Sequence, residues 1–284
     1  MKLFWYDNSR LGACIGGQAK DVTDALSVLP APTYPFSEPG DSLVANLSVV
    51  SERVRQIFDA SADINLADIK LRSPVANPTK IIGVPVNYLK HVEEAEADLG
   101  TFTARYQGPL RDQGLFLKAN SSLVGCGEGV KIRMPGRRTD HEVELAVIIG
   151  KKASFVSKED AYDYIAGYCI ALDMVVRGPE DRSFRKSIDT YSVLGPWLVT
   201  ADEIKDPQAL DFRLSVNGEV RQASNTLYMI MNIAEQIEWA SRFYTLYPGD
   251  VIMSGTCEGV GQVVSGDLIE CEMQGVGSMS VRVS

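Results

Sequence analysis

Two glutamates one residue apart, Glu142 and Glu144, stand at the start of an apolar run that ends at Gly150. The run is rich in β-branched residues and predicts a buried strand, in which residues i and i+2 point to the same face. Two carboxylates side by side repel each other unless a positive group joins them. A hard divalent cation would do so, because Mg²⁺ and Mn²⁺ prefer oxygen ligands. A strand with one solvated face would also accept the pair, so the pair alone leaves both interpretations open.

A third carboxylate, Asp173, lies within a second apolar run at 168–176. A buried aspartate is most often a hydrogen-bonded structural residue, but a second lone carboxylate among apolar neighbours strengthens the cation hypothesis. The chain has only two histidines, His91 and His141. His141 alternates to the strand face opposite that of Glu142, which indicates packing or a supporting role around the carboxylates.

The composition narrows the class of protein. The chain has 284 residues, of which 45% are hydrophobic, and its formal net charge is −9. An acidic surface argues against nucleic acid and anionic membranes as partners. No signal-peptide pattern and no long uninterrupted apolar run is found, so we expect a cytoplasmic protein without a membrane span. The five cysteines are scattered and are expected to be reduced thiols.

The elements that position these residues are expected in two parts. Residues 1–72 are predicted to form a small N-terminal α/β domain, in which short strands precede a helix at 42–59 with apolar residues at helical spacing. Two prolines mark 73–79 as a linker. Residues 80–284 are predicted to form the main domain.

The main domain is predicted to be strand-rich, with glycine-rich turns and few helices. We expect helices at 91–99, 157–165 and 225–244, the last from its apolar periodicity. The fold class is therefore α+β, with the strands arranged as a sandwich or roll and not as alternating βαβ units.

Several motifs, in chain order, resemble the fumarylacetoacetate hydrolase family. They are Asp140-His141-Glu142-Val143-Glu144-Leu145, Ala171-Leu172-Asp173, Lys186-Ser187-Ile188-Asp189-Thr190, Leu194-Gly195-Pro196-Trp197, Val216-Asn217-Gly218-Glu219 and Pro248-Gly249-Asp250-Val251-Ile252-Met253-Ser254-Gly255-Thr256. The resemblance runs from about Lys80 to the C-terminus. It implies a mixed β-sandwich roll, often preceded by a small N-terminal domain, and a homodimer.

The resemblance also implies a site. It maps a Mg²⁺ or Mn²⁺ ion onto Glu142, Glu144 and Asp173. It maps catalytic roles onto Lys186, onto Thr256 in a Gly-Thr loop, and onto a lid helix whose motif here is Tyr88-Leu89-Lys90-His91 followed by Glu94. His91 needs an orienting partner to act as a general base, and Glu94 three residues later on a helix can reach it. Substrate contacts are expected from Tyr88, Gly255, Arg177 and Arg105.

Each of these residues also has a simpler explanation. Without the motif, His91 would be taken for a surface residue of a polar helix. Lys186 lies in a basic run, which is usually a solvated face. Gly255-Thr256 alone is a weak signal, since many loops contain this pair.

The implied chemistry is metal-assisted reaction of a small 2-oxo acid. The preferred reaction is hydrolytic carbon–carbon cleavage of an acylpyruvate, such as fumarylpyruvate or fumarylacetoacetate, in which His91 activates a water and the cation stabilises the enolate that leaves. The alternatives are decarboxylation of an oxaloacetate-type acid, isomerisation of an unsaturated 2-oxo dicarboxylate, and a binding protein without activity. A distal carboxylate could be bound by Arg105, Arg177, Arg182 or Arg185, among which the sequence does not choose.

Three positions depart from the family pattern. Only twelve residues, Met174 to Arg185, separate Asp173 from Lys186, where many relatives have a longer loop. Cys257 and Ala119 each stand where proline is usual. The short segment and Cys257 line or adjoin the expected pocket and therefore affect the expected choice of substrate, whereas all three departures leave the predicted metal ligands intact.

Overall fold

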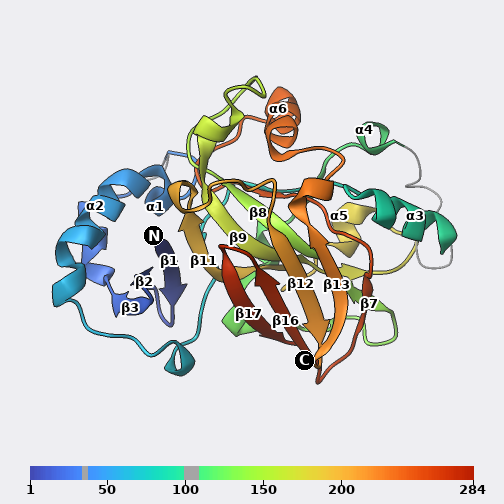
Figure 1. Ribbon diagram of the computed structural model, residues 1–284, viewed down its shortest axis with the longest axis horizontal. Helices are drawn as coiled ribbons and strands as arrows, with labels where there is room; N and C mark the ends of the chain where they lie inside the picture. Colours follow the sequence, from blue (N-terminus) through green and yellow to red (C-terminus); the bar gives the residue numbers. More distant parts are fainter. Residues whose placement is uncertain (34–37, 99–108) are drawn as a thin grey trace.

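The structure is a computed structural model that describes residues 1–33, 38–98 and 109–284. Within these ranges the strands form three sheets (Figure 1). The large sheet runs in the order β3 (Gln18–Asp21), β2 (Arg10–Ile15), β1 (Lys2–Tyr6), β11 (Ser192–Thr200), β9 (Ile165–Asp173), β8 (Val143–Ile149), β14 (Val251–Met253), β4 (Ile81–Gly83) and β5 (Phe116–Lys118), with β6 (Leu123–Gly125) also paired to β11.

The two smaller sheets lie against this one. One is β10 (Val175–Val176), β7 (Thr139–His141) and β15 (Gly261–Val263). The other is β13 (Glu219–Asn225), β12 (Asp211–Val216), β16 (Leu268–Met273) and β17 (Gly277–Arg282). Buried and exposed residues alternate along β12 and β16, as expected of strands with one face on the core.

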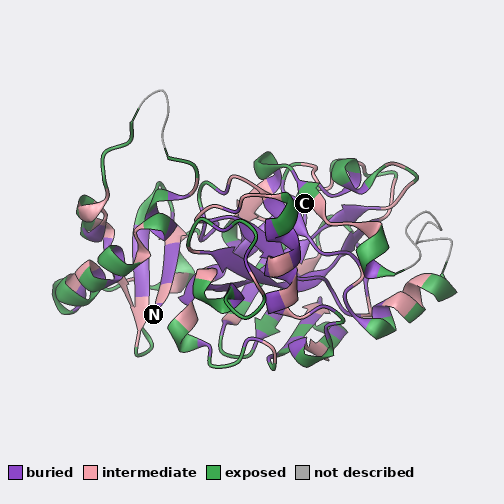
Figure 2. Cartoon of the chain, turned by 90° about the horizontal axis from the view of Figure 1, so that it is seen from above, coloured by how far each residue is buried: buried purple, intermediate pink, exposed green. Residues whose placement is uncertain are grey.

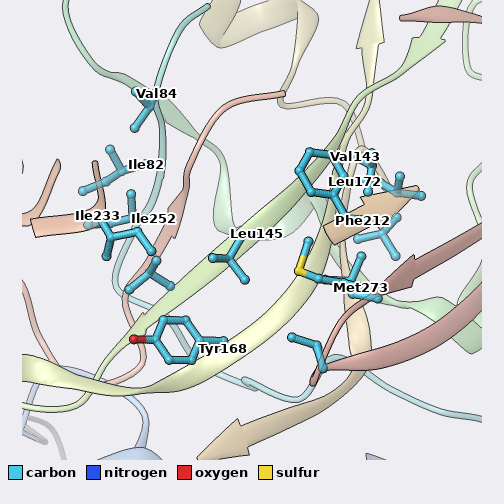
Figure 3. Close-up of a cluster of buried hydrophobic side chains, with 14 of the residues drawn as sticks. Ile82, Val84, Val143, Leu145, Tyr168, Leu172, Phe212, Ile233, Ile252 and Met273 are labelled. Atoms are coloured by element: carbon cyan, nitrogen blue, oxygen red, sulfur yellow. The ribbon is translucent and has the colours of Figure 1, made fainter. Parts of the chain in front are cut away.

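The core lies between the sheets. Every residue of β8 and β9 is buried, because both faces of these central strands are covered (Figure 2). Val143 and Leu172 of the large sheet gather with Phe212 and Met273 of the four-stranded sheet in one apolar cluster (Figure 3). The predicted strand-rich α+β fold is confirmed.

Helices cover the edges of this core. The described α-helices are α1 (Ser42–Ala45), α2 (Leu47–Ile57), α3 (Leu89–Ala97), α4 (Leu110–Gln113), α5 (Arg182–Arg185) and α6 (Ile233–Phe243). The expectation of a helix from residue 225 is wrong for its first turns, because the chain forms a capping box at Asn232. Its side chain accepts from the Glu235 amide at 3.0 Å, and Glu235 accepts from the Asn232 amide at 3.0 Å.

The helix expected at 157–165 is also wrong. A single 3₁₀ turn, η7 (Ala161–Tyr164), occupies this region, and β9 begins at Ile165, where the chain pairs with Ile149 of β8. Pairing with a buried strand overrides the local helical signal.

The first strands of the chain extend the large sheet, because β1 pairs antiparallel with β11 through Lys2–Val199 and Leu3–Leu198. Helix α2 buries Val50 and Val54 in a second apolar cluster that also contains Leu3 and Leu11. The division of the chain at residues 73–79 stays a prediction. None of the described helices is long and apolar enough to cross a membrane.

Candidate active site

The three carboxylates predicted from the sequence meet at one place in the large sheet. Glu142 precedes β8, Glu144 belongs to β8, and Asp173 ends the neighbouring strand β9. The Asp173 amide donates to the Glu142 carbonyl at 2.9 Å, which fixes the two strands in register at this point. One carboxylate oxygen of each residue lies within 4.8 Å of the others, and all three residues are buried.

Positive side chains face these carboxylates. Lys186, which follows α5, hydrogen-bonds to Glu142 and donates to Asp173 Oδ2 at 2.6 Å. Lys118, at the end of β5, hydrogen-bonds to the other oxygen of Asp173 and donates to the Tyr191 carbonyl at 2.7 Å. Arg177 Nη2 donates to Glu142 Oε1 at 3.1 Å. Three formal negative charges thus face three formal positive charges.

Lys118 was not predicted as a site residue. Its side chain is fully buried, although lysine is almost never buried without a partner. The sequence signal was a single lysine ending the apolar run Leu115-Phe116-Leu117. Its partner Asp173 lies 55 residues away in sequence, so only the folded structure reveals the contact.

The carboxylates differ in their electrostatic surroundings. Burial by itself would raise the pKa of Glu142, but the nearby charges of Lys186, Arg177 and His91 lower that pKa to about 2. Burial and the charge of Asp173 raise the pKa of Glu144 well above its ordinary value. The protein therefore stabilises the ionised form of Glu144 less than that of Glu142, and a bound cation would favour the ionisation of Glu144.

The donor set fits a hard divalent cation. It consists of carboxylate oxygens from three buried residues on two neighbouring strands, and such oxygens suit Mg²⁺ and Mn²⁺. Three protein ligands on an octahedral ion leave positions for water and substrate. The assignment of these residues as metal ligands remains a prediction.

The predicted lid residues are held together. His91 is buried on α3, and its Nδ1 lies 2.8 Å from Glu94 Oε2. The other Glu94 oxygen accepts from the Gly259 amide at 3.0 Å. The predicted pairing of His91 with Glu94 is therefore present in the structure.

A loop after β14, residues 254–259, forms another wall of the site and is called the Gly255 loop below. The Gly255 amide donates to Glu144 Oε2 at 2.6 Å. Gly255 has φ +94°, and a Cβ there would collide with the side chain of Asn87, so glycine is required. The Thr256 hydroxyl donates to the Val143 carbonyl at 2.8 Å, which commits its hydrogen to the protein backbone.

The four residues predicted to contact the substrate have different surroundings. Gly255 lies against Glu144. Tyr88 is buried, with its ring edge-on to Phe212, and burial raises its pKa well above the ordinary value, so the phenol stays protonated. Arg177 binds Glu142 and also Asp140, at 2.7 Å. Arg105 lies outside the described residues, and the substrate-binding roles stay predictions.

Two departures from the family pattern have structural explanations. The Ala119 amide donates to Ser187 Oγ at 2.9 Å, a bond that proline could not make. The short segment after Arg177 is tied down by Arg137, which binds both carboxylate oxygens of Glu180 at 2.7 Å and the Arg177 carbonyl at 2.6 Å. Cys257 is buried, and burial raises its pKa to about 12, so it stays a thiol.

Comparison with known proteins places these features in context. Residues 80–284 match the family model described as fumarylacetoacetate (FAA) hydrolase, C-terminal. The maleylpyruvate hydrolase of Aquipseudomonas alcaligenes is 51% identical over 286 residues, covering 100% of this chain and 99% of that protein. A mitochondrial oxaloacetate tautomerase of Xenopus laevis is 34% identical, covering 93% of this chain and 82% of that protein.

Solved structures of related proteins have a similar fold over the whole chain. The crystal structure of a maleylpyruvate hydrolase from Sphingobium, in complex with manganese(II) ion and pyruvate, is 39% identical, with a TM-score of 0.83. The match covers 100% of this chain and 98% of that one.

Proposed function

Because the chain belongs to the fumarylacetoacetate hydrolase family, we propose that it is a divalent-metal-dependent hydrolase of an acylpyruvate, with maleylpyruvate or a close 2,4-dioxo acid as substrate. The observation that carries this proposal is a buried carboxylate cluster joined, through the Gly255 loop, to a paired histidine and glutamate. The end-to-end similarity to a maleylpyruvate hydrolase supports the choice of substrate.

Glu142, Glu144 and Asp173 would hold the cation, with Mg²⁺ or Mn²⁺ both compatible with the ligands and Mg²⁺ our preferred ion. When bound, the ion would polarise the 2-oxo group of the substrate and offset the negative charge that develops during cleavage. The Lys186 ammonium, which joins Glu142 to Asp173, would add a donor at the same place.

His91 would be the general base. When its Nδ1–H donates to Glu94, Nε2 is the basic nitrogen and takes a proton from the attacking water. The water oxygen bonds to C4 of the substrate, and the C3–C4 bond then breaks with its electron pair going to C3. Protonation at C3 gives pyruvate, and the C4 fragment leaves as a carboxylic acid. His91 can return the proton that it accepted.

The Gly255 loop would orient the remaining groups. The Thr256 hydroxyl donates its hydrogen to the Val143 carbonyl and has no hydrogen left to donate to the substrate. Any catalytic role of Thr256 would therefore come from its position in the loop. Tyr88, which stays protonated, and Gly255 are proposed to line the substrate pocket.

The test is pyruvate formation from maleylpyruvate with Mn²⁺ or Mg²⁺, coupled to lactate dehydrogenase, with a chelator control. His91→Ala should lower kcat by about 10²–10⁴-fold, the usual contribution of a general base. Glu94→Gln should also lower kcat, whereas Glu93→Gln, an exposed acid on the same helix, should not. Absence of pyruvate from every 2,4-dioxo acid tested would refute the proposal.

Reaction of oxaloacetate is the second candidate, because relatives named as oxaloacetate tautomerases match most of the chain. Keto–enol exchange needs a base at C3 but no attack by water. Both activities should be measured on one preparation. A kcat/KM for oxaloacetate far above that for maleylpyruvate would favour this candidate.

We also infer a homodimer, as the family resemblance implies, and a cytoplasmic location, as expected from the sequence. Leu227 and Tyr228 are 63% and 64% exposed, as large apolar side chains at a subunit contact would be in one protomer. Light scattering of the purified protein tests the dimer, and a monomer at micromolar concentration would refute it.

A further inference from the structure

Gln222 is a buried polar residue that the sequence did not single out. It lies on β13 in the four-stranded sheet, yet its side chain is only 1% exposed and reaches toward the large sheet. The pairing of β13 with β12 shifts between Leu214 and Ser215, which pair with Gln222 and Val220. Such a bulge re-aims a side chain, and here the amide enters the wall of the candidate active site.

One end of the Gln222 amide holds the strand that carries the metal carboxylates. Its Oε1 accepts from the Val143 amide at 3.1 Å, and Val143 lies between Glu142 and Glu144. The same oxygen lies 3.1 Å from Nδ1 of His141, which is itself buried. The glutamine oxygen therefore fixes the backbone between the two predicted ligands.

The other end holds the Gly255 loop. Gln222 Nε2 donates to Thr256 Oγ1 at 2.8 Å and to the Cys257 carbonyl at 3.0 Å. Val143 offers an N–H and Cys257 offers a carbonyl, so the site needs one acceptor and one donor on the same side chain. Glutamine supplies both, whereas a carboxylate or an apolar side chain of equal size does not.

The Gly255 loop contacts both the carboxylate cluster and the His91–Glu94 pair. At one end the Gly255 amide donates to Glu144, and at the other the Gly259 amide donates to Glu94, the partner of His91. Gly259 has φ +87°, and a Cβ there would collide with the carbonyl of Arg221, so the loop packs directly on the strand that bears Gln222. Movement of this loop would displace a predicted metal ligand and the orienting partner of the base together.

We propose that Gln222 is a positioning residue that sets the metal carboxylates and the His91–Glu94 pair in register with each other. This inference rests on the proposed function, because it assumes that the carboxylates bind the cation and that His91 is the base. It assigns Gln222 no contact with substrate.

The test compares Gln222→Met, which keeps the size of the side chain, with Gln222→Glu, which keeps one acceptor but loses the donor. The matched control is Gln208→Met. Gln208 also bridges two backbone groups, donating to the Thr226 carbonyl at 2.7 Å and accepting from the Ile233 amide at 3.0 Å, and neither partner belongs to the candidate active site. Thermal unfolding, Mn²⁺ affinity by calorimetry, kcat and KM are measured for all variants.

Both Gln222 variants should bind Mn²⁺ about 10–100-fold more weakly, the usual effect of removing a group that orients metal ligands. At saturating Mn²⁺, kcat should fall at least about tenfold while KM changes less than about threefold, because small misplacement of a catalytic group is costly. Gln208→Met should lower the melting temperature but leave Mn²⁺ affinity within about twofold of wild type, since its bonds lie outside the metal ligands and their supports.

Gln222→Met with wild-type Mn²⁺ affinity and kcat would overturn the inference. If this variant does not fold, Gln222→Glu decides by the same criteria. Wild-type protein that binds no Mn²⁺ would overturn the proposed metal site and this inference with it. If the wild type binds Mn²⁺ and the folded Gln222 variants bind it with the same affinity, the inference is overturned and the proposed metal site is not.

Discussion

Replacing Lys118 by methionine removes a fully buried charge without leaving a large cavity, since the two side chains are similar in size. Lys118 binds Asp173 and the Tyr191 carbonyl. Burial lowers the pKa of Lys118, although the charge of Asp173 acts in the opposite direction. The lysine is therefore retained against a desolvation cost, and its loss leaves Asp173 one partner short.

The expected loss of stability follows from these contacts. Breaking a buried ion pair by removing one partner costs about 3–5 kcal/mol. The lower value applies here, because Asp173 keeps Lys186 and the Tyr191 carbonyl keeps the Met174 amide at 3.0 Å. With about 2.1 cal/mol/K of unfolding entropy per residue, a chain of 284 residues loses about 5 °C in melting temperature for 3 kcal/mol.

Thermal unfolding followed by circular dichroism in the presence of a chelator measures this effect. Lys151→Met, which removes an exposed lysine, is the control and should change the midpoint little. In an Asp173→Asn background, Lys118→Met should cost much less, because the pair is already broken. An unchanged midpoint for Lys118→Met, or an equal cost in both backgrounds, would refute the reasoning.

Three further predictions concern the metal, the thiols and alkaline pH. Mn²⁺ at about 100 times its Kd should raise the wild-type melting temperature by about 4–5 °C; Glu144→Gln should abolish this rise, and Glu159→Gln, an exposed control, should preserve it. Ellman's reagent at pH 8 should label about one thiol rapidly in the folded protein, half-buried Cys14, because the other four are buried and burial raises the pKa of Cys257 to about 12; rapid labelling of all five would contradict this. Burial raises the pKa of Tyr6 from 10.0 to about 12, so its neutral form stabilises the fold below pH 10 and this contribution is lost as pH rises from 10 to 12. In urea unfolding, the Tyr6→Phe variant should therefore lose less stability than wild type between pH 10 and 12. An equal loss in the two proteins would contradict the assignment.

The carboxylate cluster could be predicted because its signals are local. Glu142 and Glu144 obey the two-residue period of a strand, and Asp173 is the single charge in a second apolar run. The order of the family motifs then indicated that the two strands contribute to one site. The His91–Glu94 contact was equally accessible, since residues three apart on a helix are neighbours.

Lys118 and Gln222 could not be predicted in the same way. Each reaches the site through a contact between residues far apart in sequence, 55 residues for Lys118 with Asp173 and 79 residues for Gln222 with Val143. The single-residue shift that turns Gln222 inward leaves no periodic signal. The start of α6 was missed for a different reason, since apolar spacing continues before the capping box that begins the helix.

The balance of charge around the carboxylates has a consequence for how the protein matures. Small zinc domains need their ion to fold, because nothing else offsets the cost of assembling the ligands. Here Lys118, Lys186 and Arg177 already perform that task. Newly synthesised chains can therefore complete folding first and acquire the ion afterwards.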